Sequence, residues 1–382
     1  MKILIVTAFS AGFDGLWARI EKETELLAGE GHEVYVFSSN IKRGSGEIEY
    51  APEFEEKKGV KIYRFKTYFH IGQNTFFWNY TDRALKLYPD IIICHAYRQY
   101  YSTVALKIAN RLKIPCILVT HAPFLEKGIR DWKLDIIAWL YDRFVGRRIL
   151  NKYSKIFTIT KWEIPYLLKL GVKKENIIYM PNGIPEEFFK IGIKKPRNKL
   201  KKILFLGRVA PVKDIGTLIR AVKLLEKEKI ILELVGPVEE EYGEQIKNLI
   251  HNLSIENKIK MPGPVCDLGE KINIIDSCDV FVLPSKREGM PQSLVEAMAR
   301  EKIVISSNTQ GGKEIIKDKE NGYLFQIGNE SELAEKISLG LQENDLNKQI
   351  AKQARKSVER FSWDKLIKQI NNVLIKEVSK KK

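Results

Sequence analysis

A short stretch late in the chain holds the residue types that a phosphorylated, hydroxyl-rich ligand would need. Residues 283–298 read LPSKREGMPQSLVEAM, which places Glu288 in a predicted loop and Glu296 in a helix predicted over 292–300. Carboxylates accept hydrogen bonds from hydroxyl groups such as those of sugars. The two glutamates therefore predict two anchoring points for a sugar.

The residues between the glutamates form the predicted start of that helix. They are Gly289, Met290 and Pro291, and a proline in a first helical turn loses no hydrogen bond, because its missing N–H would have been unpaired there. The free backbone N–H groups and the helix dipole both favour an anion at this end. The helix start therefore predicts a phosphate site.

Two cations share a loop nearer the middle of the chain. Arg208 and Lys213 lie between a strand predicted over 202–206 and the next predicted helix. Arginine would grip a diphosphate through two hydrogen bonds and lysine as a point charge. The alternative is that both cations are solvated at the surface. We favour the phosphate site, because the helix start at Gly289 also suits a phosphate and follows a strand of the same predicted sheet.

Other candidates also stand at predicted strand ends. His95 and His121 end the strands predicted over 90–95 and 115–121, and ligands bind at the carboxyl ends of strands in open parallel sheets. We favour His121 over His95, with a buried core histidine as the alternative for each. Gly236 also follows a predicted strand, where a glycine would let a ligand ring approach the backbone.

The elements that must position these residues alternate between strand and helix. A strand over 2–7, a helix over 16–28 and a strand over 32–37 make a β-loop-α-β unit, with Gly12 and Gly15 in its loop. The loop is not G-x-G-x-x-G, so it carries no dinucleotide fingerprint. The alternation restarts after residue 202, which predicts two α/β halves.

The length of 382 residues exceeds one ordinary core and favours two domains. Residues 185–202 are rich in lysine and proline and are predicted to be the linker. We expect an N-terminal domain over 1–185 and a C-terminal domain over 186–361. The helix in 362–382 is expected to pack back on the first domain.

The composition narrows the class of partner and the cellular compartment. The net charge of +16 favours nucleic acid, an acidic membrane surface or a phosphorylated substrate, with a merely solvated surface as the alternative. The four cysteines show no C-x-x-C spacing, which argues against a zinc site and favours a reduced cytosolic protein. The first residues are too short an apolar run for a signal sequence, and no run is long enough for a membrane span.

Two further stretches have unusual compositions. Residues 63–80 are rich in aromatic side chains, for which core packing is favoured and a sugar or lipid contact surface is the alternative. Residues 124–155 combine Trp132 and Trp139 with many basic residues. A core helix with a solvated face is favoured there, and contact with an anionic membrane surface is the alternative.

These motifs resemble those of the family 4 retaining glycosyltransferases (glycosyl transferases group 1). The most specific matches are GRVAPVKD at 207–214, LVGP at 234–237 and EGMPQSLVEAMA at 288–299. Weaker matches are GHEV at 31–34, MPNGI at 180–184, NGYLF at 321–325 and FSW at 361–363. The resemblance covers nearly the whole chain.

The resemblance implies an α/β protein with the GT-B fold, in which two Rossmann-like, doubly wound parallel-sheet domains face a central cleft. It implies a retaining, metal-independent hexosyltransferase that moves a hexose such as mannose or glucose from a UDP or GDP sugar. The acceptor would be a sugar or a lipid-linked sugar in glycan or glycolipid biosynthesis. No cofactor is implied beyond the nucleotide-sugar co-substrate. The expected location is the cytoplasm, with an anionic membrane surface as a further partner and no nucleic acid.

The resemblance also implies roles for individual residues. Arg208 and Lys213 would bind the donor diphosphate and stabilise the leaving group, and His121 would lie near the donor sugar. Glu288 would lie beside the same sugar, and Glu296 would hold the ribose hydroxyls. The remaining substrate-binding residues would be glycines and the helix start, namely Gly12, Gly15, Gly207, Gly236, Gly289, Met290 and Pro291.

Some positions depart from the family pattern. Glu301 and Ile303 stand where the family usually has glycine and proline, and Gly311 and Gly312 lie one position away from the usual doubled glycine. Two other functions remain open from the sequence. A sugar-nucleotide epimerase of the same fold would release sugar without an acceptor, and a basic membrane- or nucleic-acid-binding module would have no nucleotide site.

Overall fold

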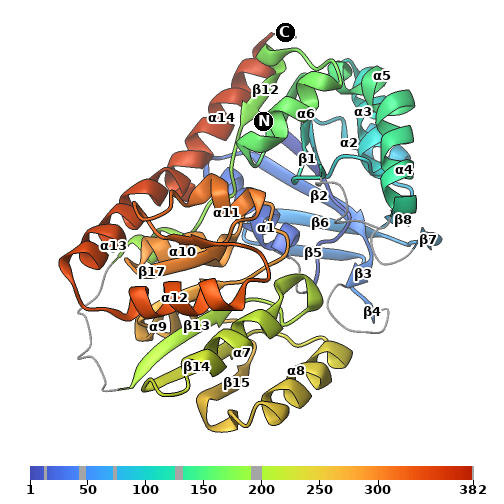
Figure 1. Cartoon of the computed structure of the whole chain (residues 1–382). Helices are drawn as coiled ribbons and strands as arrows, with labels where there is room; N and C mark the ends of the chain where they lie inside the picture. The colour runs from blue at the N-terminus through green and yellow to red at the C-terminus, as the bar shows by residue number, and fades with distance from the viewer. Residues whose placement is uncertain (13–14, 43–48, 72–74, 125–131, 191–199, 381–382) are drawn as a thin grey trace. The chain divides into compact units, whose positions relative to one another are not determined.

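The chain folds into two compact units of similar size. The computed structural model describes residues 1–12, 15–42, 49–71, 75–124, 132–190 and 200–380 (Figure 1). Unit 1 comprises residues 1–183 and 363–382, and unit 2 comprises residues 184–362. These divisions fall within two residues of the boundaries expected from the sequence.

Unit 2 is built on a six-stranded parallel sheet with the order β15-β14-β13-β16-β17-β18. The strands are β13 (Lys201–Leu206), β14 (Ile230–Val235), β15 (Ile259–Gly263), β16 (Val280–Leu283), β17 (Ile303–Ser307) and β18 (Tyr323–Phe325). In chain order this is the 3-2-1-4-5-6 arrangement of doubly wound sheets. The order reverses between β13 and β16, so the loops after these two strands meet where such sheets bind ligands.

The strands and helices of unit 2 follow from their apolar patterns. All four residues of β16 are buried, as expected for a parallel strand that is covered on both faces. The principal helices are α7 (Ile215–Leu224), α8 (Glu240–Asn252), α9 (Leu268–Ser277), α10 (Gln292–Ala299), α12 (Glu330–Leu341) and α13 (Asp345–Val358). Helix α10 starts one residue after Pro291, which is its N-cap and not a residue of its first turn.

Unit 1 contains an eight-stranded sheet with the order β12-β11-β10-β9-β1-β2-β6-β5. The strands are β1 (Lys2–Val6), β2 (Glu33–Ser39), β5 (Phe54–Lys57), β6 (Val60–Phe65), β9 (Ile91–His95), β10 (Cys116–Val119), β11 (Lys155–Thr158) and β12 (Ile177–Tyr179). Only β5, at one edge of this sheet, runs antiparallel to its neighbour. The strand order reverses between β1 and β9, in the same way as in unit 2.

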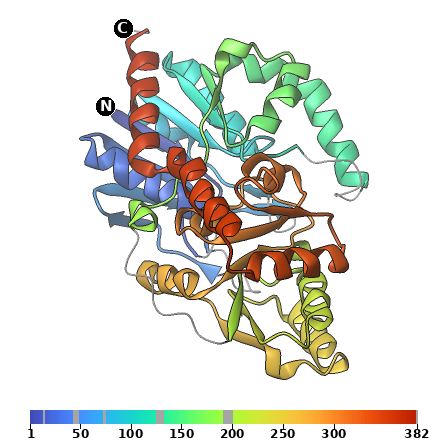
Figure 2. The same cartoon turned by 60° about the vertical axis from the view of Figure 1, so that its left-hand side comes forward.

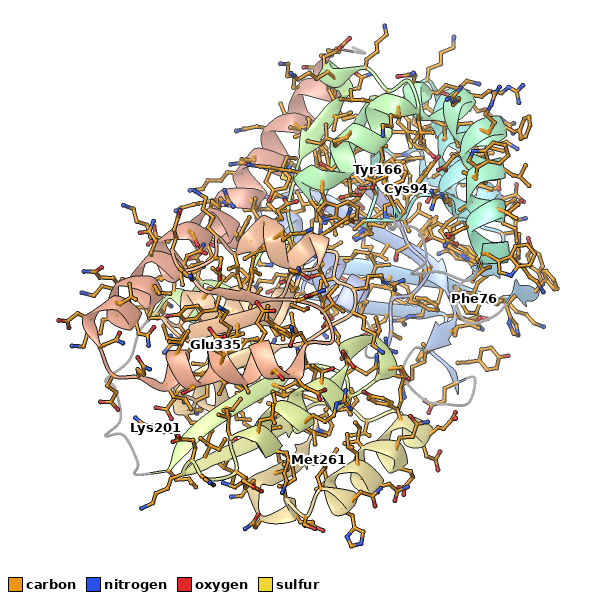
Figure 3. The ribbon with its side chains drawn as sticks, in the orientation of Figure 1. Phe76, Cys94, Tyr166, Lys201, Met261 and Glu335 are labelled. Atoms are coloured by element: carbon orange, nitrogen blue, oxygen red, sulfur yellow. The ribbon has the colours of Figure 1, made fainter. Side chains whose placement is uncertain are left out.

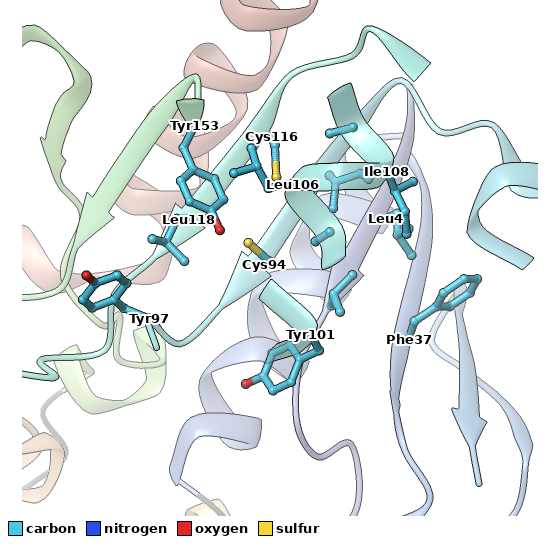
Figure 4. Close-up of a cluster of buried hydrophobic side chains, with 14 of the residues drawn as sticks. Leu4, Phe37, Cys94, Tyr97, Tyr101, Leu106, Ile108, Cys116, Leu118 and Tyr153 are labelled. Carbon is cyan, nitrogen blue, oxygen red and sulfur yellow. The ribbon is translucent and has the colours of Figure 1, made fainter. Parts of the chain in front are cut away.

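The core of unit 1 lies between the sheet and helix α3 (Tyr100–Leu112). Figure 4 shows Cys94 and Cys116 on neighbouring strands near the ring of Tyr153. The Tyr153 hydroxyl donates a hydrogen bond to the Ser102 carbonyl at 3.0 Å. Both cysteines are buried in this core.

The C-terminal helix α14 (Trp363–Ser379) belongs to unit 1 and packs against α1 (Gly15–Gly29). Figures 1 and 2 both show it running past the N-terminus. His32 Nε2 lies 2.8 Å from Asn371 Oδ1 on this helix. A Cβ atom on Gly183 would lie 2.3 Å from the Trp363 ring. The glycine of PNG and the tryptophan of FSW are therefore packing partners.

The predicted linker is partly folded. Residues Glu186–Phe189 form a 3₁₀ turn, and Phe188 is fully buried in unit 2. The Arg300 guanidinium donates a hydrogen bond to the Phe188 carbonyl at 3.4 Å. The linker prediction was therefore wrong for this segment, because its apolar residues have a place in the unit 2 core. Residues 191–199 lie outside the described part of the chain.

The aromatic stretch over 63–80 divides between core and surface. Trp78 and Tyr80 are buried, and Trp78 stacks on Phe65 with ring centroids 5.6 Å apart. Tyr68 and Phe69 are instead more than half exposed. Core packing is therefore confirmed for Trp78 and Tyr80, and a sugar or lipid contact surface stays a prediction for Tyr68 and Phe69. The stretch also contains short strands that were not predicted, β7 (Phe69–Ile71) and β8 (Thr75–Phe77).

The basic, Trp-containing stretch does not form the favoured core helix. Helix α4 (Trp132–Tyr141) has no buried residue, so the prediction of a buried face was wrong. Its apolar residues lie on all sides of the helix instead of along one stripe. Residues 125–131 of the stretch are not described. Among the described residues, no helix has the length and apolar character needed to cross a membrane.

Candidate functional site

An ion pair stands at the point in unit 2 where the strand order reverses. Lys213 follows β13 and Glu288 follows β16, and Lys213 Nζ lies 2.6 Å from Glu288 Oε1. The Ser285 hydroxyl donates to the same carboxylate oxygen at 2.6 Å. The structure thus brings together two predicted residues and adds Ser285, whose three-residue spacing from Glu288 allows the contact.

The two loops that carry this pair are fixed to each other. The Lys286 backbone N–H donates to the Val212 carbonyl at 2.9 Å. Asp214 follows with a positive φ of 49° and accepts a hydrogen bond from the Thr217 hydroxyl at 2.8 Å. These bonds hold the ends of both loops, so the position of the ion pair is set by backbone as well as by charge.

The start of α10 is the predicted phosphate site. Pro291 occupies the N-cap position without a side-chain capping hydrogen bond. The loop before α10 packs closely against Gly311. A Cβ atom on Gly311 would lie 2.4 Å from the Gly289 carbonyl oxygen. Gly311 belongs to α11 (Gln310–Ile315), a helix missed from the sequence. The shifted double glycine therefore still lets this helix lie against the Glu288–Gly289 loop.

Glu296 has a cationic partner that sequence reasoning missed. Lys271 on α9 places its ammonium nitrogen 2.7 Å from the Glu296 carboxylate. The Glu296 side chain is only 7% exposed, so the lysine offsets the cost of burying its charge. The two residues are distant in sequence and lie on different helices, so no local pattern signals the pair.

The second predicted cation lies apart from the first. Arg208 is more than half exposed, and its Nη1 atom lies 2.8 Å from Glu239 Oε1 after β14. Lys213 instead pairs with Glu288 after β16, and β14 and β16 flank β13 on opposite sides. The structure therefore does not show the two cations converging on one point, although both lie in one loop.

Gly236 has a structural role at the neighbouring strand end. A Cβ atom there would lie 2.0 Å from the carbonyl oxygen of Gly207. Both glycines have positive φ angles, which other residues adopt with strain. The close approach predicted for a ligand is thus made by protein backbone.

The carboxyl edge of the unit 1 sheet carries two neighbouring histidines. His95 ends β9 and His121 follows β10, and His95 Nδ1 lies 2.9 Å from His121 Nε2. Burial lowers the pKa of both imidazoles well below the usual value, and the charge of Arg19 lowers them further. Both rings are therefore neutral near pH 7, and they can share only one proton along the line between them.

A buried carboxylate holds the turn that contains His121. Glu163 accepts hydrogen bonds from the Thr120 hydroxyl at 2.5 Å and from the Ala122 N–H at 2.9 Å. His121 and Ala122 both have positive φ angles, so this turn needs such support. Burial raises the pKa of Glu163, and these hydrogen bonds oppose that shift. The sequence T-K-W-E at 160–163 is a capping-box pattern that could have revealed this glutamate.

Helix α1 adds a buried ion pair to the same unit. Arg19 Nε lies 3.4 Å from Glu23 Oε2, and Arg19 Nη1 donates to Asn182 Oδ1 at 2.8 Å. Burial lowers the pKa of Arg19 and raises that of Glu23. Gly12 has a positive φ of 87° and Gly15 begins α1. Residues 13–14 between these glycines are not described.

Two family patterns together match most of the chain. The family described as Glycosyltransferase Family 4 matches residues 13–188, and the family described as Glycosyl transferases group 1 matches residues 185–357. The two matches meet near residue 185, close to the division between the two units.

Individual relatives match over nearly the full length. An uncharacterised glycosyltransferase of Methanocaldococcus jannaschii is 27% identical over 94% of each chain. An α-1,4-N-acetyl-D-galactosaminyltransferase of Campylobacter jejuni, named for an undecaprenol-diphosphate-linked substrate, is 25% identical over 89% of this chain and 91% of its own. The crystal structure of Anabaena HepE with UDP and glucose has a TM-score of 0.76 at 17% identity, covering 98% of this chain and 99% of its own. That structural likeness concerns the fold.

Proposed function

Because the chain belongs to the family 4 glycosyltransferases with the GT-B fold, we propose that it moves a hexose from a nucleotide-diphosphate sugar to an acceptor. The acceptor is a sugar or a lipid-linked sugar in glycan or glycolipid biosynthesis. The single observation that carries the proposal is the Lys213–Glu288 pair beside the uncapped start of α10, where the strand order of unit 2 reverses.

The donor diphosphate is assigned to unit 2. A ligand phosphate accepts hydrogen bonds from the α10 start at Gly289 and Met290, and the dipole of this helix favours its charge. Lys213 lies next to that helix start through its bond to Glu288. Arg208 is exposed and long enough to turn from Glu239 to an arriving phosphate, since exposed ion pairs are weak. The structure of HepE in complex with UDP and glucose supports a donor of UDP type, with a GDP sugar as the alternative.

The two glutamates are assigned different hydroxyl groups. Glu288 orients the donor sugar, because its Oε1 already receives two hydrogen bonds and its other oxygen is left to accept from a hydroxyl. Glu296 accepts from the ribose hydroxyls, with Lys271 balancing its charge. These roles follow the family resemblance at matching positions.

Catalysis in this scheme depends on charge at the leaving group. Departure of the nucleoside diphosphate builds negative charge on its oxygens, and Lys213 and Arg208 stabilise that charge in place without requiring a metal ion. The acceptor attacks on the face from which the diphosphate leaves, so the anomeric configuration is retained. A leaving-group oxygen helps to remove the acceptor proton. Glu288 is held by Lys213 and Ser285, which suits orientation better than attack on the anomeric carbon.

Unit 1 is assigned the remaining contacts. The neutral ring of His121, supported by His95 and by the turn that Glu163 holds, contacts the donor sugar. Gly12 and Gly15 belong to the loop that contacts the acceptor. We place the enzyme in the cytoplasm at the inner face of a membrane.

The first test compares Glu288→Ala with Glu335→Ala, a substitution of an exposed glutamate on α12. A thermal-shift screen of nucleotides and nucleotide sugars first identifies the donor, because a bound nucleotide stabilises the folded state. Transfer to acceptor should fall by at least about 10²-fold in Glu288→Ala. Glu335→Ala should match the wild type. Full activity in Glu288→Ala would remove its assigned role.

Two product analyses separate the proposal from its alternatives. NMR of the product anomer should show the donor configuration, and an inverted anomer would exclude retention. Incubation with donor alone should yield no epimerised sugar, because the proposed reaction requires an acceptor. Acceptor-independent release of an altered sugar would identify an epimerase instead.

A further inference from the structure

Helix α4 of unit 1 is apolar on every side and buried on none. Its exposed large apolar residues, together with one in the π-helical turn η1 (Asp142–Gly146), form what we call the α4 surface. The α4 surface consists of Trp132, Leu134, Ile136, Ile137, Trp139, Leu140 and Phe144. Among the described residues, 20 large hydrophobic side chains are exposed, so about a third of them gather on this one segment.

Such a helix is unusual on a protein surface. Helices that are apolar on all sides are normally enclosed by protein or lipid, and large exposed apolar patches mark interaction sites. Trp132 is 66% exposed and Trp139 is 61% exposed. Figure 3 shows side chains standing out from this helix on the same side of unit 1 as β7.

A basic border accompanies the α4 surface. Lys133, Arg143, Arg147, Arg148 and Lys152 are all exposed. Only two acidic residues fall in the same segment over 132–152. One of them, Asp142, is already occupied by the Arg98 guanidinium, whose Nη2 atom lies 2.6 Å from Asp142 Oδ2. The exposed charge next to the apolar residues is therefore positive.

The base of the segment is fixed to the core of unit 1. The Tyr97 hydroxyl donates to Asp142 Oδ1 at 3.0 Å. A Cβ atom on Gly146 would lie 2.1 Å from the same hydroxyl oxygen, so the turn η1 packs tightly on Tyr97. Helix α4 is thus held to the core of unit 1 at its C-terminal end, through η1.

We propose that the α4 surface lies in the headgroup region of an anionic lipid bilayer. Tryptophan prefers the membrane–water interface, and exposed lysine and arginine bind anionic headgroups. The ten residues of α4 extend about 15 Å, half of a bilayer core of about 30 Å, so the helix lies along the membrane without crossing it. This inference rests on the proposed location of the enzyme at a membrane. Its test does not depend on the transfer reaction.

A neighbouring hairpin supplies a second contact. Tyr68 and Phe69, at the start of the β7–β8 hairpin, are each more than half exposed. Phe77 of this hairpin contacts Tyr100 on α3, with ring centroids 5.2 Å apart. The hydroxyl of Tyr141, the last residue of α4, lies 3.4 Å from the hydroxyl of Thr103, which is also on α3. Both aromatic groups therefore flank the start of α3, and the membrane-facing region extends across it.

Charge argues for a bilayer and against a second copy of this chain. Two copies joined through the α4 surface would bring two basic borders together, and like charges at an interface oppose association. An anionic headgroup layer meets both requirements at once, because it offers negative charge above and an apolar phase below.

The test measures binding of the full chain to vesicles by co-sedimentation. Vesicles of equal parts phosphatidylglycerol and phosphatidylcholine are compared with pure phosphatidylcholine at low salt. The paired substitution Trp132→Ala and Trp139→Ala should lower the partition coefficient on anionic vesicles by about tenfold or more. The matched control substitutes two exposed leucines of unit 2, Leu224→Ala and Leu346→Ala, and should bind as the wild type does.

A charge variant separates the two parts of the proposal. Substituting Arg143, Arg147 and Arg148 by glutamine should lower anionic binding by about tenfold or more, and added salt should do the same to the wild type. The control changes Lys317→Gln and Lys348→Gln on unit 2, which are exposed to a similar extent. Circular dichroism melts confirm that every variant is folded.

Three results would overturn the proposal. The first is no binding of the wild type to anionic vesicles at low salt. The second is equal binding to pure phosphatidylcholine. The third is a tryptophan variant that binds vesicles as well as the wild type, whether or not it has lost a dimer seen by sedimentation velocity.

Discussion

The two units place different chemistry at the carboxyl edges of their sheets, beside neighbouring parallel strands. In unit 2 the loops after β13 and β16 hold Lys213 and Glu288 as an ion pair at 2.6 Å. In unit 1 His95 ends β9 and His121 follows β10, and the nitrogens of these two neutral rings lie 2.9 Å apart. Both pairs lie at the carboxyl edge of a doubly wound sheet. The fold therefore selects where a ligand can bind, and the side chains select which ligand.

Burial explains the difference between the two edges. Lys213 keeps about a fifth of its side chain exposed, so an anion can reach it. His95 is fully buried, and a buried imidazole loses its proton because the charged form is poorly solvated. Unit 2 is thus suited to a diphosphate and unit 1 to hydrogen bonds with uncharged groups.

The largest expected effect is on the charged edge. Lys213→Ala should lower kcat/KM by about 10³-fold, since the leaving diphosphate loses a fixed cation. The matched substitution Lys286→Ala removes a more exposed lysine 3.8 Å from Asp214 and should change kcat/KM by less than about threefold. Steady-state kinetics with both variants checks this. Equal losses in the two would mean that overall positive charge acts, and not one placed cation.

The next effect is on the neutral edge and concerns stability. Glu163→Ala should lower the free energy of unfolding by about 3 kcal/mol, because the donors of Thr120, Ala122 and Thr160 lose their acceptor. Glu256→Ala on the surface of unit 2 should change it by less than about 0.5 kcal/mol. Urea unfolding measures both values. A small change in Glu163→Ala would show that the His121 turn holds without this carboxylate.

A smaller effect tests how the charged edge is positioned. Gly311→Ala places a Cβ atom against the Gly289 carbonyl and displaces the Glu288 loop, which should lower kcat/KM by about 10²-fold. Gly29→Ala, at a helix end where a Cβ atom meets nothing within 4 Å, should leave kcat/KM near that of the wild type. Kinetics at saturating donor distinguishes a positioning loss from weaker binding. An active Gly311→Ala enzyme would show that the loop position is not critical.

The smallest expected effect is on the pH dependence of stability, which should differ between variants of the two sheet edges. Both histidines have lowered pKa values in the folded state, so the unfolded chain binds more protons below about pH 6.5, and stability falls as the pH drops. The paired substitution His95→Gln and His121→Gln should reduce that fall. Lys213→Ala should keep the wild-type dependence. Thermal melts near neutral pH and at about pH 5 provide the measurement. Identical dependence in all three proteins would mean that the histidines do not remain neutral.

Local patterns in the sequence predict much of this structure. The parallel strands β1, β2, β9, β10 and β13 were predicted within two residues at each end, because buried strands have continuous apolar runs bounded by turn residues. Glu288 and Lys213 could be singled out because each follows such a run. The strands from β5 to β8 in the early part of unit 1 were not predicted. Strands β5, β7 and β8 are short and pair antiparallel, whereas β6 also pairs in parallel with β2.

What the sequence could not reveal depends on tertiary contacts. Lys271 and Glu296 lie on different helices, and nothing local links them. The exposure of α4 was also hidden, since an apolar helix has the same composition whether it is enclosed or bare. Arg208 and Lys213 are the opposite case, because they are close in sequence but their side chains have different partners. Arg208 pairs with Glu239, and Lys213 pairs with Glu288.

The path of the chain through unit 2 has a practical consequence. The Ile184 N–H donates to the Phe361 carbonyl at 2.8 Å, so the first and last residues of this unit meet. Unit 2 is therefore a continuous insertion, over residues 184–362, between the two parts of unit 1. Unit 1 can be rejoined across the excision by a few added residues, because Gly183 already packs on Trp363. The nucleotide recognition proposed for unit 2 and the membrane attachment proposed for unit 1 can thus be tested on separate polypeptides.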